Sequence, residues 1–157
     1  MTIKLLSVGK TDDTTLQDLI ATYVNRLGHY NNFKFEIISD LKKTKNLNFE
    51  QQKTMEGKLI LDKIQPSDFL VLLDENGKQF SSEGFAEYIQ KRLNSGMKQL
   101  IFVIGGPYGF SEEVYQRANS KVSLSKMTFS HQMVRLFFVE QLYRAFTILK
   151  NEPYHHK

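Results

Sequence analysis

Short apolar runs alternate along the chain with longer stretches in which apolar residues recur at helical spacing. The short runs predict buried strands, and they cover residues 3–9, 33–38, 69–73, 100–104 and 122–124. The longer stretches predict helices, and they cover residues 16–27, 49–64, 82–93, a segment that opens at 111–113, and residues 130–149.

This order of elements indicates an α/β fold. Strands that alternate with helices through short loops form a mainly parallel sheet flanked by helices. Continuous apolar strands such as residues 69–73 and 100–104 are typical of a sheet that is covered on both faces. Residues 74–78 are expected to turn the chain after the third strand. No repeat or linker divides the sequence, so residues 1–157 are predicted to form one domain.

The last helix is apolar around nearly its full circumference, with apolar side chains at Met133, Val134, Leu136, Phe137, Phe138, Val139, Leu142 and Phe146. Such a helix is buried on more than one side. In a small protein this predicts a subunit interface as well as a core, and we therefore expect a homodimer. Glu140 and Arg144, four residues apart in the favourable order, are expected to pair on the remaining polar side.

Composition is typical of a globular protein. The 157 residues are 41% hydrophobic and 24% charged, and no apolar run approaches the roughly 20 residues of a membrane span. The absence of cysteine excludes disulfides, thiolate nucleophiles and cysteine-ligated zinc. The N-terminal segment lacks the apolar core of a secretion signal. We therefore expect a cytoplasmic protein that does not associate with membranes.

Positive charge is concentrated near the C-terminus. Residues 121–157 hold six Lys or Arg against two Asp or Glu, which accounts for the whole formal net charge of +4, and they also hold three of the four histidines. This asymmetry indicates a polyanionic partner, most simply nucleic acid. Chance accumulation on one helix and a tail is the alternative.

Three loops follow strands whose carboxyl ends are expected to lie together. They begin after Leu73, at Gly105 and at Leu124. Ligands of open parallel sheets bind outside these ends, and paired glycines let the backbone approach a ligand and offer N–H groups to it. The sequence GGPYG is neither GxGxxG nor a P-loop, so a plain tight turn is the alternative.

The polar loop 124–129 leads to a helix start that holds two cationic side chains. Ser130 is a good N-cap residue, and His131 and Arg135, four residues apart, are expected to lie one above the other. Cations at this end oppose the helix dipole. A bound anion would offset that cost, whereas a solvated helix end is the alternative.

The C-terminal tail combines Pro153, Tyr154, His155 and His156. The tyrosine ring is suited to stacking on a base, and the histidines titrate near neutral pH. A frayed terminus is the alternative. The chain has no GxSxG or HExxH motif and no paired carboxylates typical of hydrolases, and no metal site is expected.

Five of these segments together resemble the RlmH family, which are small bacterial methyltransferases of the SPOUT superfamily. In order, the segments are LLDENGK, FVIGGPYG, LSKMTFSHQMVR, EQLYRA and the terminal PYH. The similarity extends over essentially the whole chain. The departures are Ser130, where proline is common, and the doubled histidine before the terminal lysine, and both lie outside the motif residues.

The resemblance implies a SPOUT-type fold whose C-terminal segment is threaded into a trefoil knot, an exception to the rule that chains stay unknotted. It implies a homodimer that binds S-adenosylmethionine in the knot and methylates N3 of a pseudouridine in a stem-loop of large-subunit (23S) ribosomal RNA, within assembled ribosomes. By position, the cofactor contacts would be Leu73, Gly105, Leu124, Ser125, Lys126, Met127, Thr128 and Phe129.

Methyl transfer from a sulfonium requires neither an enzyme nucleophile nor a metal, which suits a chain without cysteine. The acceptor nitrogen must lie in line with the methyl group and lose its proton. Arg135 is the candidate for stabilising negative charge on the substrate or its phosphate. His131, Tyr154 and His155 are candidates for positioning the base or accepting the proton, and a partner's tail could complete the pocket. The rival functions are a non-catalytic ribosomal RNA-binding module and a nucleotide-binding regulatory domain.

Overall fold

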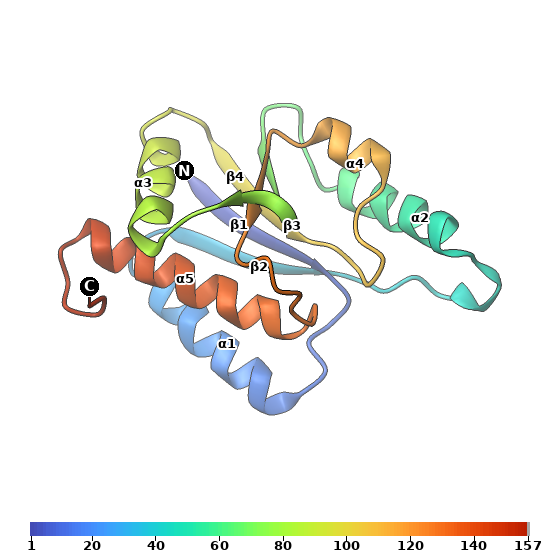
Figure 1. Ribbon diagram of the computed structural model, residues 1–157, viewed down its shortest axis with the longest axis horizontal. Helices are drawn as coiled ribbons and strands as arrows, with labels where there is room; N and C mark the ends of the chain where they lie inside the picture. The colour runs from blue at the N-terminus through green and yellow to red at the C-terminus, as the bar shows by residue number, and fades with distance from the viewer. Residues whose placement is uncertain (157) are drawn as a thin grey trace.

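A five-stranded sheet forms the middle of three layers in the computed structural model, which describes residues 1–156 (Figure 1). The elements in chain order are β1 (Thr2–Val8), α1 (Thr14–Leu27), β2 (Asn32–Ile38), the 3₁₀ helix η1 (Thr44–Asn46), α2 (Phe49–Leu61), β3 (Phe69–Gln79), α3 (Ser82–Leu93), β4 (Gln99–Ile104), α4 (Glu112–Arg117), β5 (Ser120–Ser123) and α5 (Met133–Leu149).

The strands lie in the order β2-β1-β4-β3-β5, and every neighbouring pair is parallel. Because successive side chains of a strand point to opposite faces, each central strand supplies both sides of the core. In β4, Leu100 and Phe102 pack on one side while Ile101 and Val103 pack on the other. The predicted α/β fold with a parallel sheet is confirmed.

Helices cover both faces of the sheet. Apolar side chains of α1, α3 and α5 pack into one core, which includes Leu16, Phe85 and Phe138. Helices α2 and α4 cover the opposite face through Ile60 and Val114. Figure 1 shows α5 beside α1 and α3, with α2 and α4 on the far side of the strands. None of the described helices is long and apolar enough to cross a bilayer.

The predicted turn at residues 74–78 is wrong, because β3 continues to Gln79. Its ladder with β5 breaks after the Leu73–Val122 pair and resumes with Lys78, which pairs with the same Val122. The intervening residues form an irregularity within the strand instead of ending it. Residues 74–76 lie within this irregular segment.

The start of the last helix also differs from the prediction, because α5 begins at Met133. Ser130 still acts as a cap: its Oγ accepts a hydrogen bond from the Met133 N–H at 3.0 Å, and its carbonyl accepts from Val134 N–H. At the other end of the helix, the predicted pair of Glu140 and Arg144 is present at 2.5 Å.

Candidate functional site

A cavity of about 580 Å³ lies between the irregular segment of β3 and the loops that follow β4 and β5. These strands are neighbours in the sheet, so the loops that follow them converge on one edge. Its wall includes seven of the eight predicted cofactor contacts and one predicted catalytic residue, namely Leu73, Gly105, Leu124, Ser125, Met127, Thr128, Phe129 and His131. The sequence therefore predicted which segments surround the cavity.

Short hydrogen-bonded turns hold the loop 124–129 in place. The Ser125 Oγ accepts from the Met127 N–H at 3.0 Å, and the Ser125 carbonyl accepts from the Ser123 hydroxyl at 2.9 Å. Across the cavity, the Thr128 hydroxyl donates to the Glu75 carboxylate at 3.0 Å. This bond links the loop after β5 to the irregular segment of β3, and it places a carboxylate at the cavity wall.

The glycine loop packs closely on a buried carboxylate. The Gly109 N–H donates to the Gly106 carbonyl at 3.2 Å and closes the loop. A Cβ on Gly106 would lie 2.6 Å from both carboxylate oxygens of Glu56, so any side chain there would have to displace this carboxylate. Glu56 comes from α2, is 3% exposed, and its Oε1 has no hydrogen-bond partner. Burial raises the pKa of this carboxyl, and Asp40 adds a smaller upward shift.

Arg135 does not line this cavity, although it was predicted to contact the substrate. Its side chain is fully buried, and it donates to the Val8 carbonyl, the Thr11 hydroxyl and the His131 carbonyl, each at 3.0 Å. Burial lowers the pKa of the guanidinium. In this chain Arg135 therefore fixes the start of α5 to the loop after β1.

Gln132 strengthens the same attachment. Its amide accepts from the Asp12 N–H at 2.9 Å and donates to the Lys10 carbonyl at 3.0 Å. Gln132 and Arg135 thus both hold the backbone near His131 against the loop after β1. The His131 side chain itself is exposed at the cavity wall.

Tyr154 and His155 belong to the tail that follows α5, and they pack against Glu140 and Arg144 of that helix. The Tyr154 hydroxyl donates to Glu140 at 2.9 Å and lies 3.2 Å from the Tyr23 hydroxyl. His155 contacts Arg144 at 3.1 Å through Nδ1 and Glu83 at 3.1 Å through Nε2. Burial and the hydrogen bonds to Tyr23 and Glu140 raise the pKa of Tyr154. Neither residue lines the cavity of its own chain.

Comparison with known proteins places this arrangement in a family. The family model described as predicted SPOUT methyltransferase matches residues 1–155. Proteins named ribosomal RNA large subunit methyltransferase H are similar over the whole of both chains: 75% identical in Christiangramia forsetii, 64% in Flavobacterium johnsoniae and 51% in Porphyromonas gingivalis. The chain belongs to the RlmH family of SPOUT methyltransferases.

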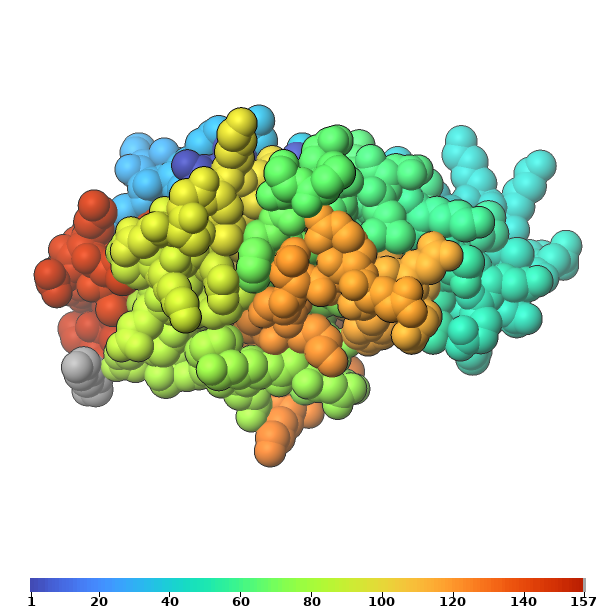
Figure 2. All heavy atoms as spheres, turned by 90° about the horizontal axis from the view of Figure 1, so that it is seen from above, coloured from blue at the N-terminus to red at the C-terminus, as the bar shows by residue number. Residues whose placement is uncertain are grey.

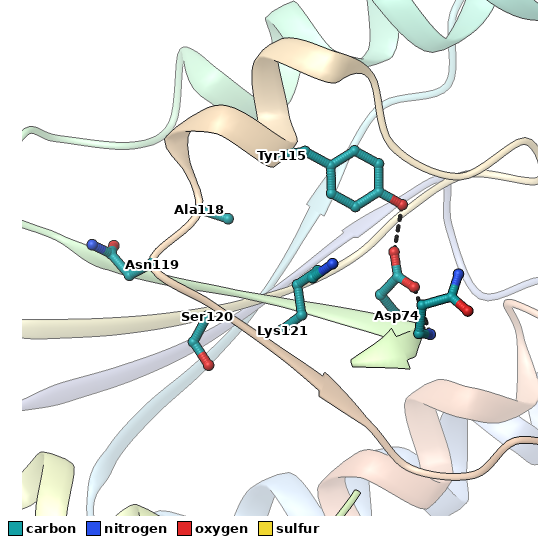
Figure 3. Close-up of a pocket in the computed structure, with 7 residues that line it drawn as sticks. Asp74, Tyr115, Ala118, Asn119, Ser120 and Lys121 are labelled. Carbon is teal, nitrogen blue, oxygen red and sulfur yellow. Dashed lines mark hydrogen bonds between the residues drawn. The ribbon is translucent and has the colours of Figure 1, made fainter. Parts of the chain in front are cut away.

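A second, polar cavity of about 390 Å³ adjoins the first in this SPOUT chain (Figure 3). The two share Asp74, Asn76 and Tyr115, and the Tyr115 hydroxyl donates to the Asp74 carboxylate. Burial and this bond raise the pKa of Tyr115. Two further polar residues of the second cavity are hydrogen-bonded: Asn119 accepts from the Leu70 N–H, and Ser120 accepts from Tyr88.

Several residues at the SPOUT cavity were not identified from sequence. Glu75 and Tyr108 line it, and Glu56 lies beneath its glycine loop. Lys126, by contrast, was predicted as a contact but does not line it and is exposed. Among the described residues, no group of three or more His, Asp or Glu side chains is placed to hold a metal ion.

Proposed function

We propose that the chain transfers a methyl group from S-adenosylmethionine to N3 of a pseudouridine in large-subunit (23S) ribosomal RNA within assembled ribosomes. One observation supports this proposal most directly. Leu73, Gly105 and residues of the loop 124–129 line one cavity, and the chain belongs to a methyltransferase family. The printed name of its relatives supports ribosomal RNA as the substrate class.

The residues of the cavity suit this cofactor. Its volume of about 580 Å³ lies within the range of about 300–1,000 Å³ for small-molecule sites. Leu73, Met127 and Phe129 offer apolar surface to an adenine ring. The Ser125 and Thr128 hydroxyls and the backbone of the glycine loop offer polar partners, and Glu75 offers a negative charge to a cationic ligand. Bound S-adenosylmethionine would supply an electrophilic methyl group on a sulfonium.

The chain's own contribution is to position the base and manage its proton. His131 is exposed at the cavity wall, and Arg135 fixes its backbone, so it is the candidate for positioning the base or accepting the N3 proton. Tyr154 is a weaker proton acceptor, because its raised pKa keeps the hydroxyl protonated. We assign Tyr154 to positioning, and His155 stays a candidate for either role.

We infer a homodimer in which each tail completes the cavity of the other subunit. Phe129, Met133 and Phe137 are large apolar side chains that remain exposed near the cavity end of α5, and the Phe129 and Phe137 rings pack 5.0 Å apart. In a two-fold dimer with antiparallel α5 helices, this end of one subunit would meet the tail end of the other. That packing would bring Tyr154 and His155 to His131.

Two further expectations belong to this proposal. The threading of the C-terminal segment into a trefoil knot follows from the family's known fold and is a prediction for this chain. A cytoplasmic location follows from the proposed substrate, since assembled ribosomes are found there.

Calorimetric titration of S-adenosylmethionine into the purified protein tests the proposal, followed by transfer of labelled methyl to ribosomes that lack the modification. We expect saturable binding and label in the large-subunit RNA. A folded protein that binds ribosomes but no S-adenosylmethionine would support the RNA-binding module instead. Competition of the cofactor by ATP or NAD would favour the nucleotide-binding regulatory domain.

A further inference from the structure

Two aromatic rings stack on each other at the molecular surface beside the cavity. The ring centroids of Phe49 and Tyr108 lie 4.2 Å apart with an interplanar angle of 23°. Phe49 nevertheless remains 64% exposed and Tyr108 40% exposed. Large aromatic side chains contribute most when they are buried, so an exposed stacked pair indicates a surface on which another flat group can pack.

The pair is held at a fixed place on the rim of the cavity. Tyr108 belongs to the glycine loop and lines the cavity, whereas Phe49 is the first residue of α2 and lies outside it. A capping box fixes the start of α2: Asn48 accepts from the Gln51 N–H at 2.8 Å, and Gln51 accepts from the Asn48 N–H at 3.0 Å. The stacking therefore connects the glycine loop to the segment that precedes α2.

That preceding segment is strongly basic. Lys42, Lys43 and Lys45 are exposed, and none of them forms an ion pair within the part of the chain that the structure describes. Lys43 occupies the N-cap position of η1 and has a left-handed backbone conformation, with a φ of 60°. Figure 2 shows side chains of this cyan segment projecting from one end of the molecule.

We propose that Phe49, Tyr108 and the three lysines of residues 42–45 form an RNA-binding platform that stacks a nucleobase flanking the methylated nucleotide. Exposed aromatic faces beside lysines are the combination that binds unpaired nucleotides, because the rings stack on bases and the lysines contact phosphates. A second copy of this chain would bring a like-charged segment to the same place, and this disfavours it as the occupant. The platform rests on the proposed methylation of ribosomal RNA.

The test compares Phe49→Ala with Met55→Ala, which removes a 41% exposed apolar side chain from the same helix and away from the cavity. Methyl transfer to unmodified ribosomes gives KM and kcat, and calorimetry gives the affinity for S-adenosylmethionine. We expect Phe49→Ala to raise KM for ribosomes about tenfold, the order of one lost base-stacking contact. Cofactor affinity and kcat should not change, and Phe49→Tyr should restore KM.

A second readout separates this platform from the proposed function. Triple replacement of Lys42, Lys43 and Lys45 by Ala should flatten the salt dependence of binding to a fluorescent ribosomal RNA stem-loop, and Phe49→Ala should weaken that binding even if the wild type methylates nothing. An unchanged KM and unchanged stem-loop affinity in Phe49→Ala would overturn the platform. A loss of dimer or of cofactor affinity in that variant would also overturn it, in favour of a subunit or cofactor contact.

Discussion

The predicted catalytic residues at the start of α5 and in the tail after it differ in exposure and bonding. The amino end meets the cavity, where His131 is exposed and Met127 and Phe129 also remain exposed. At the carboxyl end, Tyr154 and His155 are bonded into a network with side chains of α1, α3 and α5. At the amino end, His131 presents an exposed side chain to the cavity, whereas at the other end both predicted side chains are already hydrogen-bonded.

The proposed catalytic residues do not come together in one chain. Helix α5 has 17 residues, which corresponds to about 25 Å at 1.5 Å per residue. Tyr154 and His155 pack against Glu140 and Arg144 of this helix, and neither of them lines the cavity that His131 lines. This difference between the ends supports a site divided between two subunits.

Deleting residues 154–157 should reduce activity the most, because it removes the hydrogen-bonded residues of the tail. We expect methyl transfer to fall by roughly 10³-fold, a typical effect of losing groups that position or deprotonate a substrate, while the affinity for S-adenosylmethionine stays the same. His156→Ala is the control and should retain activity. A truncated protein that no longer folds would show instead that the network with Glu140 and Glu83 makes the tail structural.

Arg135→Met should destabilise the amino end of α5, which meets the cavity. The Val8 and His131 carbonyls and the Thr11 hydroxyl would lose a donor in the core, and we expect the free energy of unfolding to fall by about 3 kcal/mol. Urea denaturation measures this. Lys150→Met, at the exposed carboxyl end of the same helix, should stay within about 0.5 kcal/mol of wild type. Equal stability of all three proteins would contradict the structural role of Arg135.

Gly105→Leu should weaken cofactor binding without disturbing the tail. A Cβ at this position would lie 3.0 Å from the Phe110 ring, so the larger side chain must displace that ring or enter the cavity. We expect affinity for S-adenosylmethionine to fall roughly 100-fold, or about 2.7 kcal/mol, with the tail network intact. Unchanged calorimetric affinity in a folded variant would place the cofactor elsewhere.

Glu56→Gln should have the smallest effect and a clear pH dependence. The raised pKa of Glu56 means that its neutral form is favoured in the fold. Its stabilising contribution is complete below the ordinary value of 4.5 and is lost as pH rises through the raised pKa. The variant should therefore gain on wild type as pH rises, by about 1 kcal/mol at neutral pH. A stability difference that does not vary with pH would show that folding does not raise the pKa of Glu56.

The contrast also shows what the sequence could predict. Apolar periodicity and the loops that begin after Leu73, at Gly105 and at Leu124 predicted the parallel sheet and the segments around the cavity, because those features are local. The burial of Arg135 was not visible, since its partners at Val8 and Thr11 lie 127 and 124 residues away.

Other misses have similar causes. Glu56 looks like a solvent-facing residue of an amphipathic helix, and only the packing of α2 against Gly106 reveals that it is buried. The continuation of β3 through residues 74–79 depends on pairing with β5, which overrides the turn preference of Asn76 and Gly77.

The divided site is tested most directly with mixed dimers that combine a Gly105→Leu subunit with a subunit lacking residues 154–157. Each homodimer should be inactive, because the first lacks cofactor binding and the second lacks the tail. In a purified heterodimer, one cavity would have both an intact wall and an intact tail from its partner. We expect methyl transfer at about half the wild-type rate per dimer. Two folded, dimeric variants whose heterodimer stays inactive would contradict a site shared between subunits.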